Sequence, residues 1–174
     1  LGDVYKRQVV YQSRELSNEN IPLENVLIEQ PIQIVSNSMT GLGLRFKDVD
    51  PNSKNQFSVV VKNDSGENIY TENIPENKIH NDQIYYLRFN ASKLKVGSIY
   101  SITVKSLGAT RASMVTVNPR ENEYSMVRNC MINQEESKQS IAYSVIDGNC
   151  FHLRNFYWLI VLLILILITM TYLM

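Results

Sequence analysis

Cysteine, histidine and clustered charge are all scarce in this sequence, and each shortage excludes a class of protein. Only 2 Cys and 2 His occur among 174 residues, and none stands in a CxxC or HExxH spacing. Lysine plus arginine number 17, aspartate plus glutamate also number 17, and no basic run exceeds a pair. Nucleic-acid and polybasic lipid contacts need a clustered positive face. The sequence therefore indicates no nucleic-acid partner, and it carries no motif for a cofactor.

Alanine and leucine are also scarce before residue 155, whereas Asn, Ser, Ile, Val and Tyr are common. This balance favours strands and turns over helices. Apolar and polar residues alternate in four clear runs, marked by Leu42, Leu44 and Phe46; by Phe57, Val59 and Val61; by Tyr85, Leu87 and Phe89; and by Tyr100, Ile102 and Val104. Such alternation predicts half-buried strands.

Turn signals separate these runs every ten to fifteen residues, which is typical of an antiparallel sandwich or barrel. Asn63-Asp64-Ser65-Gly66 predicts a hairpin, and segment 15–22 reads as a loop. Pro31 confines any strand at 33–35 to an edge or a strand start. We predict strands at 9–12, 26–28, 39–46, 56–63, 68–74, 84–89, 99–106 and 111–117, with further outer candidates at 124–132 and 141–146. The predicted fold class is all-β, a jelly-roll-like antiparallel β-sandwich of about eight or nine strands.

The last nineteen residues, Phe156 to Met174, carry no charge and no polar stripe. A helix of this length reaches about 28 Å, close to the hydrocarbon thickness of a bilayer. Phe156, Tyr157 and Trp158 place amphipathic rings where they suit the headgroup level, and Arg154 is the last charge before them. We therefore predict one C-terminal transmembrane helix, anchored in a lipid bilayer by these three rings.

Both ends of the chain resemble cut ends. Residues 2–8, GDVYKRQ, resemble a translated transposon end of the kind used in sequencing libraries, so we expect 1–8 to be a non-native segment. The native chain would then begin near Val9, without its own start or any first membrane helix, and the apolar run stops without a polar flank. The predicted organisation is an extramembrane β-sandwich at 9–149, a juxtamembrane segment at 150–155 and the membrane helix at 156–174.

Several of these patterns together resemble an extracytoplasmic β-sandwich found in bacterial polytopic membrane proteins. The residues that carry the resemblance are Gln30, Leu42-x-Leu44-x-Phe46, Phe57-x-Val59-x-Val61, Asp64-Ser65-Gly66, Asn81-Asp82 before Tyr85-x-Leu87-x-Phe89, and Gly97-x-x-Tyr100-x-Ile102. Those proteins are similar to membrane glycosyltransferases of the GT-C type or to cell-surface polysaccharide proteins. The resemblance covers about residues 26–146 and implies a sandwich inserted between two membrane helices, of which the first is missing here.

Two polar groupings are candidate sites. Asp48-x-Asp50-x-Asn52 has the oxygen spacing that opens a calcium loop, but Ser53 replaces the required Gly and Val59 replaces the closing Glu, so a surface turn is the better interpretation. His80 with Asp82 offers a base and an orienting acid, yet no nucleophile motif accompanies them. No catalytic residue is therefore assigned.

The tyrosines are the candidate glycan contacts, because flat aromatic faces stack on sugars. The candidates are Tyr70, Tyr85, Tyr86, Tyr100 and Tyr124. Tyrosines paired across strands more often fill the edge of a core, and this alternative stays open. Asn63-Asp64-Ser65 and Asn90-Ala91-Ser92 match glycosylation acceptors, which matter only in a lumenal domain of a eukaryote.

The two cysteines, Cys130 and Cys150, either form a disulfide or stay free thiols. A disulfide would close a loop of about twenty residues and stabilise the fold by roughly 3 kcal/mol.

Three functional classes follow from these features. The first is an accessory extracytoplasmic domain, structural or recognising a glycan, of a membrane protein in envelope polysaccharide or glycolipid assembly. The second is a single-anchor surface protein whose sandwich binds carbohydrate or protein. The third, an enzyme in its own right, lacks a catalytic constellation, although the parent protein could be a membrane glycosyltransferase. We expect the sandwich on the extracytoplasmic side, against a weak opposite signal from His152 and Arg154.

Overall fold

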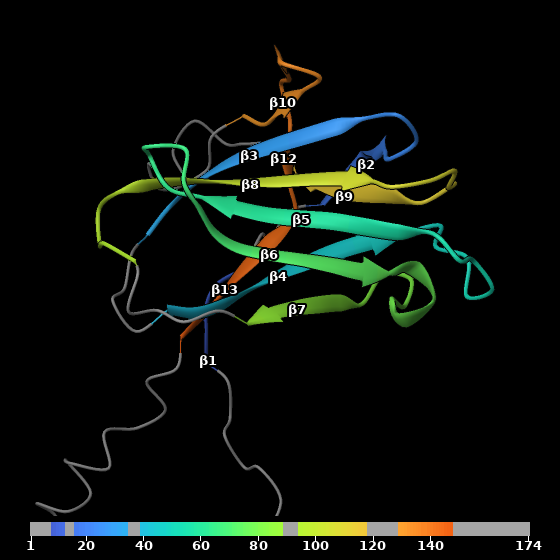
Figure 1. The fold of residues 1–174 in the computed structure, drawn as a ribbon, viewed down its shortest axis with the longest axis horizontal. Coiled ribbons are helices and arrows are strands. Elements are labelled where there is room, and N and C mark those ends of the chain that lie inside the picture. Colours follow the sequence, from blue (N-terminus) through green and yellow to red (C-terminus); the bar gives the residue numbers. More distant parts are fainter. Residues whose placement is uncertain (1–7, 13–15, 35–38, 89–93, 118–128, 148–174) are drawn as a thin grey trace, which may run out of the picture.

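The computed structural model describes residues 8–12, 16–34, 39–88, 94–117 and 129–147 (Figure 1). This part of the chain is all-β, with two antiparallel sheets and one short 3₁₀ turn, η1 (Glu76–Lys78). The seven-stranded sheet contains β1 (Gln8–Gln12), β2 (Leu16–Pro22), β4 (Met39–Lys47), β7 (Ile84–Arg88), β9 (Ser113–Val117), β12 (Ser140–Ile141) and β13 (Tyr143–Asp147). The six-stranded sheet contains β3 (Leu27–Gln33), β5 (Gln56–Lys62), β6 (Asn68–Pro75), β8 (Ile99–Ser106), β10 (Met131–Ile132) and β11 (Glu135–Glu136).

The order of the six-stranded sheet is β11-β10-β3-β8-β5-β6. In the other sheet the order is β1-β13-β4-β9-β12, with β2 also paired to β9 and β7 also paired to β4. The described residues thus form thirteen strands, more than the predicted eight or nine. The excess includes β10, β11 and β12, which have two residues each and are too short for alternation to reveal.

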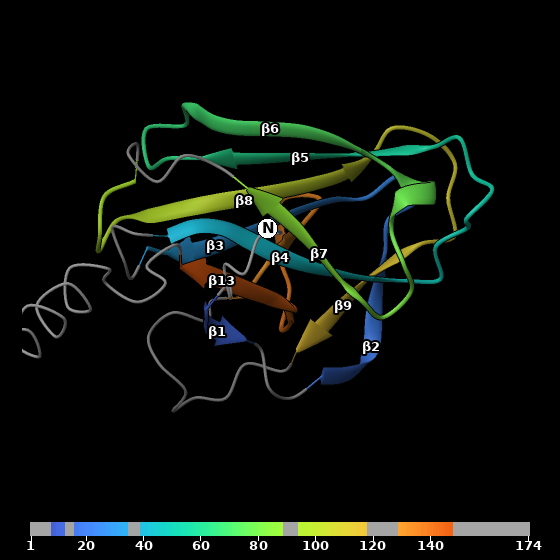
Figure 2. The same cartoon turned by 90° about the horizontal axis from the view of Figure 1, so that it is seen from below.

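One apolar core lies between the two sheets, in a sandwich-like arrangement (Figure 2). The alternating residues predicted to face inward in β5 and β8 are buried in it. Phe46 of β4 stacks on Phe57 of β5 with ring centroids 5.4 Å apart, which joins the sheets within the core. The all-β prediction is therefore confirmed for these residues.

The middle of β4 is buried on both faces, whereas the sequence predicted a half-buried strand. Leu42 and Leu44 face the core, and Gly41 and Gly43 on the other face are also buried. A Cβ at Gly43 would lie 2.4 Å from Ile84 Cγ2, so this glycine allows the side chains of β7 to pack directly over β4. The strand is central because β13, β7 and β9 all pair with it.

The prediction of a loop at 15–22 is wrong, because β2 occupies Leu16–Pro22 and pairs with β9. Ile21 lies opposite Met114 and is buried in the core. The polar sequence of β2 has low strand propensity, so this strand depends on its pairing with β9.

Pro31 lies inside β3, which runs through it from Leu27 to Gln33, so the separate strand predicted at 33–35 does not begin after it. The strand β10 pairs with only Ile28 and Glu29 of β3. At Pro31, β3 therefore has β8 on one side and no other described strand on the opposite side. A residue without an N–H is tolerated at such a locally unpaired edge.

The strand β13 was predicted to be an outer strand but lies between β1 and β4. The end of β13 shows at which end of the sheets the described chain begins and ends. Ile146 pairs with Val9, and Asp147 lies opposite Met39, where β4 begins. The two outer ends of the described chain therefore lie side by side. The loops that follow β4, β6 and β8 lie at the other end of the sheets (Figure 1).

The β10–β11 turn contains two residues with positive φ, Asn133 at 50° and Gln134 at 72°. Asparagine tolerates this conformation well, but glutamine does not. We expect Gln134→Gly to raise the free energy of unfolding by about 0.5 kcal/mol, because the relief of strain exceeds the added entropy of the unfolded chain. Urea denaturation measures the difference, and Gln139→Gly, away from the turn, should be destabilising. A loss of stability in Gln134→Gly would contradict the assignment of strain.

No helix long and apolar enough to cross a bilayer occurs among the described residues. The predicted membrane helix at 156–174, with Phe156, Tyr157 and Trp158, lies outside them, as do Tyr124, Asn90 and Cys150.

Candidate functional site

The loops at the far end of the sheets meet on one buried carboxylate, that of Glu76, whose exposed fraction is 1%. Its Oε1 accepts hydrogen bonds from the Asp50 backbone N–H at 3.1 Å and from the Thr110 hydroxyl at 2.9 Å. Its Oε2 accepts from the Ser53 hydroxyl at 2.9 Å and from Asn55 Nδ2 at 3.1 Å. All four donors are uncharged. Through these hydrogen bonds Glu76 connects the loop after β4 and the loop after β8 to its own turn. We call these five residues the Glu76 network.

Asn55 continues this network toward β8. Its Nδ2 also donates to Ser106 Oγ at 2.8 Å, which fixes the orientation of the amide. Its Oδ1 is buried and has no hydrogen-bond partner. This oxygen lies against Gly108, where a Cβ would stand only 3.0 Å from it. A side chain at position 108 would therefore crowd the Asn55 amide, and the buried oxygen is closed to ligands.

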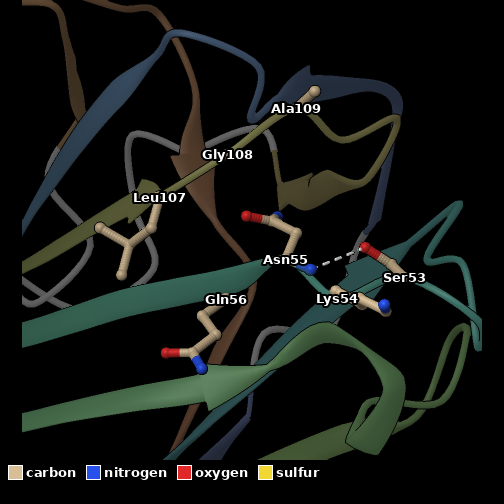
Figure 3. A pocket seen from close by; sticks show the side chains of 7 residues that line it. All are labelled: Ser53, Lys54, Asn55, Gln56, Leu107, Gly108 and Ala109. Carbon is tan, nitrogen blue, oxygen red and sulfur yellow. Dashed lines mark hydrogen bonds between the residues drawn. The ribbon is translucent and has the colours of Figure 1, made fainter.

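Asn55 and Gly108 also line a shallow hollow of about 460 Å³ (Figure 3). Its other lining residues are Ser53, Lys54, Gln56, Leu107 and Ala109. Figure 3 shows Leu107, just after β8, and Gln56, at the start of β5, on one side, and Ser53 and Lys54 on the other. Leu107 is 50% exposed, so the hollow combines one apolar side chain with polar ones.

A larger groove of about 760 Å³ lies next to this hollow. We call it the loop-end groove; it is lined by Glu24, Asp48, Val49, Asp50, Pro51, Ser53, Glu76, Ala109, Thr110 and Arg111. Its volume falls within the range of small-ligand sites, about 300–1,000 Å³. Glu24, Asp48, Asp50 and Arg111 are exposed, and Arg111 forms no ion pair with any described carboxylate. The Glu76 network therefore forms part of the wall of a groove that offers both acceptors and a cation.

Two of the three calcium candidates, Asp48 and Asp50, line this groove as turn residues, whereas Asn52 does not line it. Asp50 Oδ1 accepts the Asn52 backbone N–H at 2.8 Å, which closes a turn. Asp48 has a φ of 56° and its Oδ2 lies 3.5 Å from the Ser113 hydroxyl. Within the described ranges, no three His, Cys, Asp or Glu side chains converge as a metal site.

His80 and Asp82 lie in an exposed turn before β7. The Asp82 N–H donates to the Phe46 carbonyl at 3.0 Å, so Asp82 acts here through its backbone. Between them, the side-chain amide of Asn81 pairs with the backbone of Val49 in the way a neighbouring strand does. Its Oδ1 accepts the Val49 N–H at 2.8 Å, and its Nδ2 donates to the Val49 carbonyl at 3.3 Å. The sequence signalled Asn81 only as part of the resemblance, and its structural role is to hold the wall of the groove.

Two of the candidate tyrosines meet on one carboxylate at the side of the molecule. Tyr70 and Glu72 belong to β6, and Tyr85 belongs to β7 in the other sheet. Tyr85 donates to Glu72 Oε1 at 3.0 Å, and Tyr70 donates to Glu72 Oε2. This tyrosine–glutamate clamp joins the two sheets along one side.

The other candidate tyrosines lie elsewhere. Tyr100 is 3% exposed and its hydroxyl accepts the Lys95 N–H at 3.1 Å. Tyr86 is 37% exposed and covers Gly43, its partner across the strands. An aromatic ring over a cross-strand glycine stabilises a sheet. The described tyrosines thus form no single platform, and Tyr86 is the most available to a sugar.

Because of the tyrosine–glutamate clamp, we expect the fold to lose stability at high pH. Burial, the hydrogen bond to Glu72 and its negative charge raise the pKa of Tyr85 from 10.0 to about 12. The same causes, in the same order, raise the pKa of Tyr70. Because the folded state favours the neutral phenols, this stabilisation is complete below pH 10 and is lost as the pH rises toward 12. Urea midpoints measured across this window should fall, and the double variant Tyr70→Phe with Tyr85→Phe should show a smaller fall. An equal fall in the variant would contradict the prediction.

Gln30 makes a second link between the sheets, inside the core, where it is fully buried. Its Oε1 accepts from the Ser140 hydroxyl at 2.8 Å and from the Ile141 N–H at 2.9 Å. Its Nε2 donates to the Pro31 carbonyl at 3.0 Å. A buried amide with these partners fixes β12 of one sheet against β3 of the other.

Cys130 is fully buried, and its burial raises the pKa of the thiol. A buried thiol with a raised pKa has low reactivity. Because Cys150 lies outside the described residues, the disulfide stays a prediction.

Comparison of the chain with protein-family models, with curated proteins and with solved structures finds no match in any of the three.

Proposed function

We propose that the chain is an accessory extracytoplasmic domain of an integral membrane protein that assembles cell-envelope polysaccharide or glycolipid. In this proposal a jelly-roll-like β-sandwich precedes one transmembrane helix at 156–174. The domain contributes structure or recognition and makes no bonds. The observation that carries the proposal is the pairing of Val9 with Ile146, which puts the two outer ends of the sandwich side by side.

Adjacent ends suit a domain that is inserted between two consecutive membrane helices, because both connections can reach the same bilayer surface. The uncharged run after residue 155 supplies one such helix. The resemblance to polytopic envelope proteins supports the same arrangement.

Binding is favoured over catalysis by the way the groove is built. Acid–base catalysis needs titratable groups that converge in a pocket. Here the buried carboxylate, Glu76, already accepts four hydrogen bonds, and Asp50 closes a turn. A single-anchor surface protein that binds carbohydrate or protein is the second candidate, and the same groove supports it.

Membrane extraction and protease accessibility test the proposal. The full chain, expressed in a Gram-positive host, should stay in the membrane after carbonate washing, whereas a chain ending at residue 155 should be released. External protease should digest the sandwich in intact protoplasts that carry the parent protein with its preceding membrane helix. Release of the full chain by carbonate would refute the membrane anchor. Digestion only after the membrane is breached would refute the orientation.

A further inference from the structure

We infer that the loop-end groove binds an uncharged glycan chain in the aqueous phase, away from the bilayer, and not a glycolipid headgroup at the membrane surface. This inference rests on the proposed function and narrows it. Three observations support it: the position of the groove relative to the chain ends, the charges in its lining, and the hydrogen bonds that hold its walls in place without a ligand.

The groove lies at the far end of the sheets from the predicted anchor. Asp147 pairs with Met39 at the start of β4, and the groove residues Asp48 to Ser53 follow directly after β4 ends at Lys47. Eight strand steps of about 3.3 Å place the groove roughly 26 Å from Asp147. The headgroup layer of a bilayer is only about 5–8 Å thick on each side. A domain held by both ends at the near side therefore presents the groove beyond the headgroups.

The charges of the lining disfavour an anionic ligand. Glu24, Asp48 and Asp50 are exposed carboxylates, and Arg111 is the only cation in the lining. With three carboxylates and one guanidinium, the exposed lining carries a net negative charge. Phosphate headgroups and acidic polysaccharides would meet net repulsion. Neutral sugars carry no charge and are not repelled by these carboxylates.

The same side chains can recognise hydroxyl groups. Carboxylates act only as acceptors and the guanidinium acts only as a donor, so together they match vicinal hydroxyls, which donate and accept. Pro51 and Ala109 add apolar surface beside them for the C–H faces of a sugar ring.

The walls of the groove are fixed before any ligand arrives. Glu76 binds the Asp50 backbone on one wall and the Thr110 hydroxyl on the other. Binding then requires little ordering of loops, which favours measurable affinity from a modest contact area.

The test uses the full chain in lipid nanodiscs and measures affinity by calorimetry. The probes are soluble neutral oligosaccharides of glucose, galactose, mannose and N-acetylglucosamine, polygalacturonate as an acidic glycan, and vesicles that contain glucosyl-diacylglycerol. We expect at least one neutral oligosaccharide to bind. The double variant Asp48→Asn with Asp50→Asn should weaken that affinity at least tenfold, and so should Arg111→Gln. Asparagine keeps the positive φ at position 48 and the turn oxygen at position 50, so the fold is retained.

Asp64→Asn, an identical change in the exposed hairpin at the near end, is the matched control and should leave the affinity unchanged. The inference is overturned by the absence of neutral-sugar binding at millimolar concentration, by binding of only polygalacturonate or only glycolipid vesicles, or by neutral-sugar affinity that the groove variants do not change. Carbonate extraction is scored separately, so failure of the membrane anchor is distinguishable from failure of the glycan site.

Discussion

Glu76→Ala is expected to lower the free energy of unfolding by about 3–5 kcal/mol, a large share of the roughly 5–15 kcal/mol that stabilises a domain. The substitution removes the acceptor of four hydrogen bonds from a position with 1% exposure. The Asp50 N–H and the Asn55 amide cannot turn to water without moving their loops. The hydroxyls of Ser53 and Thr110 can rotate, which keeps the loss below the sum of four unsatisfied groups.

Asn77→Ala is the matched control, because Asn77 is the next residue of the same turn and is exposed. It should change stability by no more than about 0.5 kcal/mol. Urea denaturation of the full chain in detergent, followed by circular dichroism, measures both variants, and an unchanged slope shows that the unfolded state is the same. If Glu76→Ala costs less than about 1 kcal/mol, the carboxylate does not hold the loops as described.

Gly41→Ala is expected to cost about 3 kcal/mol or more, although it adds a single methyl group. A Cβ at this position would lie 2.2 Å from the Leu87 carbonyl oxygen and 3.3 Å from the Leu87 carbonyl carbon. Both atoms belong to the backbone of β7, so no side-chain rotation relieves the contact. The strands β4 and β7 must separate, although they pair over five residues.

Thr40→Ala, one residue earlier in β4, tests whether the strand itself tolerates small changes, and should cost less than about 1 kcal/mol. Amide hydrogen exchange adds a local readout: in Gly41→Ala the protection of β7 should fall more than that of β5, on the far side of the core. Unchanged protection in β7, with native stability, would show that the glycine is not required for this close approach.

Regular alternation predicted the strands that build the centre of the fold. The runs at Leu42 to Phe46, Phe57 to Val61 and Tyr100 to Val104 all became strands that contribute to the core. Turn chemistry was equally informative: Gly66 and Gly97 both adopt positive φ where the sequence indicated turns. These signals are local, so a single sequence contains them.

The sequence did not predict the features that depend on strand partners distant along the chain. β2 has a polar sequence and forms by pairing with β9, about ninety residues later. The same is true of β13, whose central position follows from its neighbours β1 and β4. Pro31 was expected at an edge or a strand start, but it lies inside β3, between β10 and β8, where one side of the strand is unpaired only because β10 is short.

The groove was predicted only in fragments. Asp48 and Asp50 attracted attention as possible calcium ligands, and they line the groove as turn residues. Glu76 was not a candidate, because nothing beside it in the sequence shows that it is buried. Its donors Asn55 and Thr110 lie 21 and 34 residues away, and only the fold brings them together.

The side-by-side ends of the sandwich also determine how it responds to tension. Val9 and Ile146 are partners in an antiparallel pair, so a pull on both ends loads the β1–β13 hydrogen bonds one pair after another. Unzipping of this kind needs less force than shearing all pairs at once. If the domain joins two membrane helices, as proposed, separation of those helices would peel β1 from β13 before the core of the sandwich bore any load.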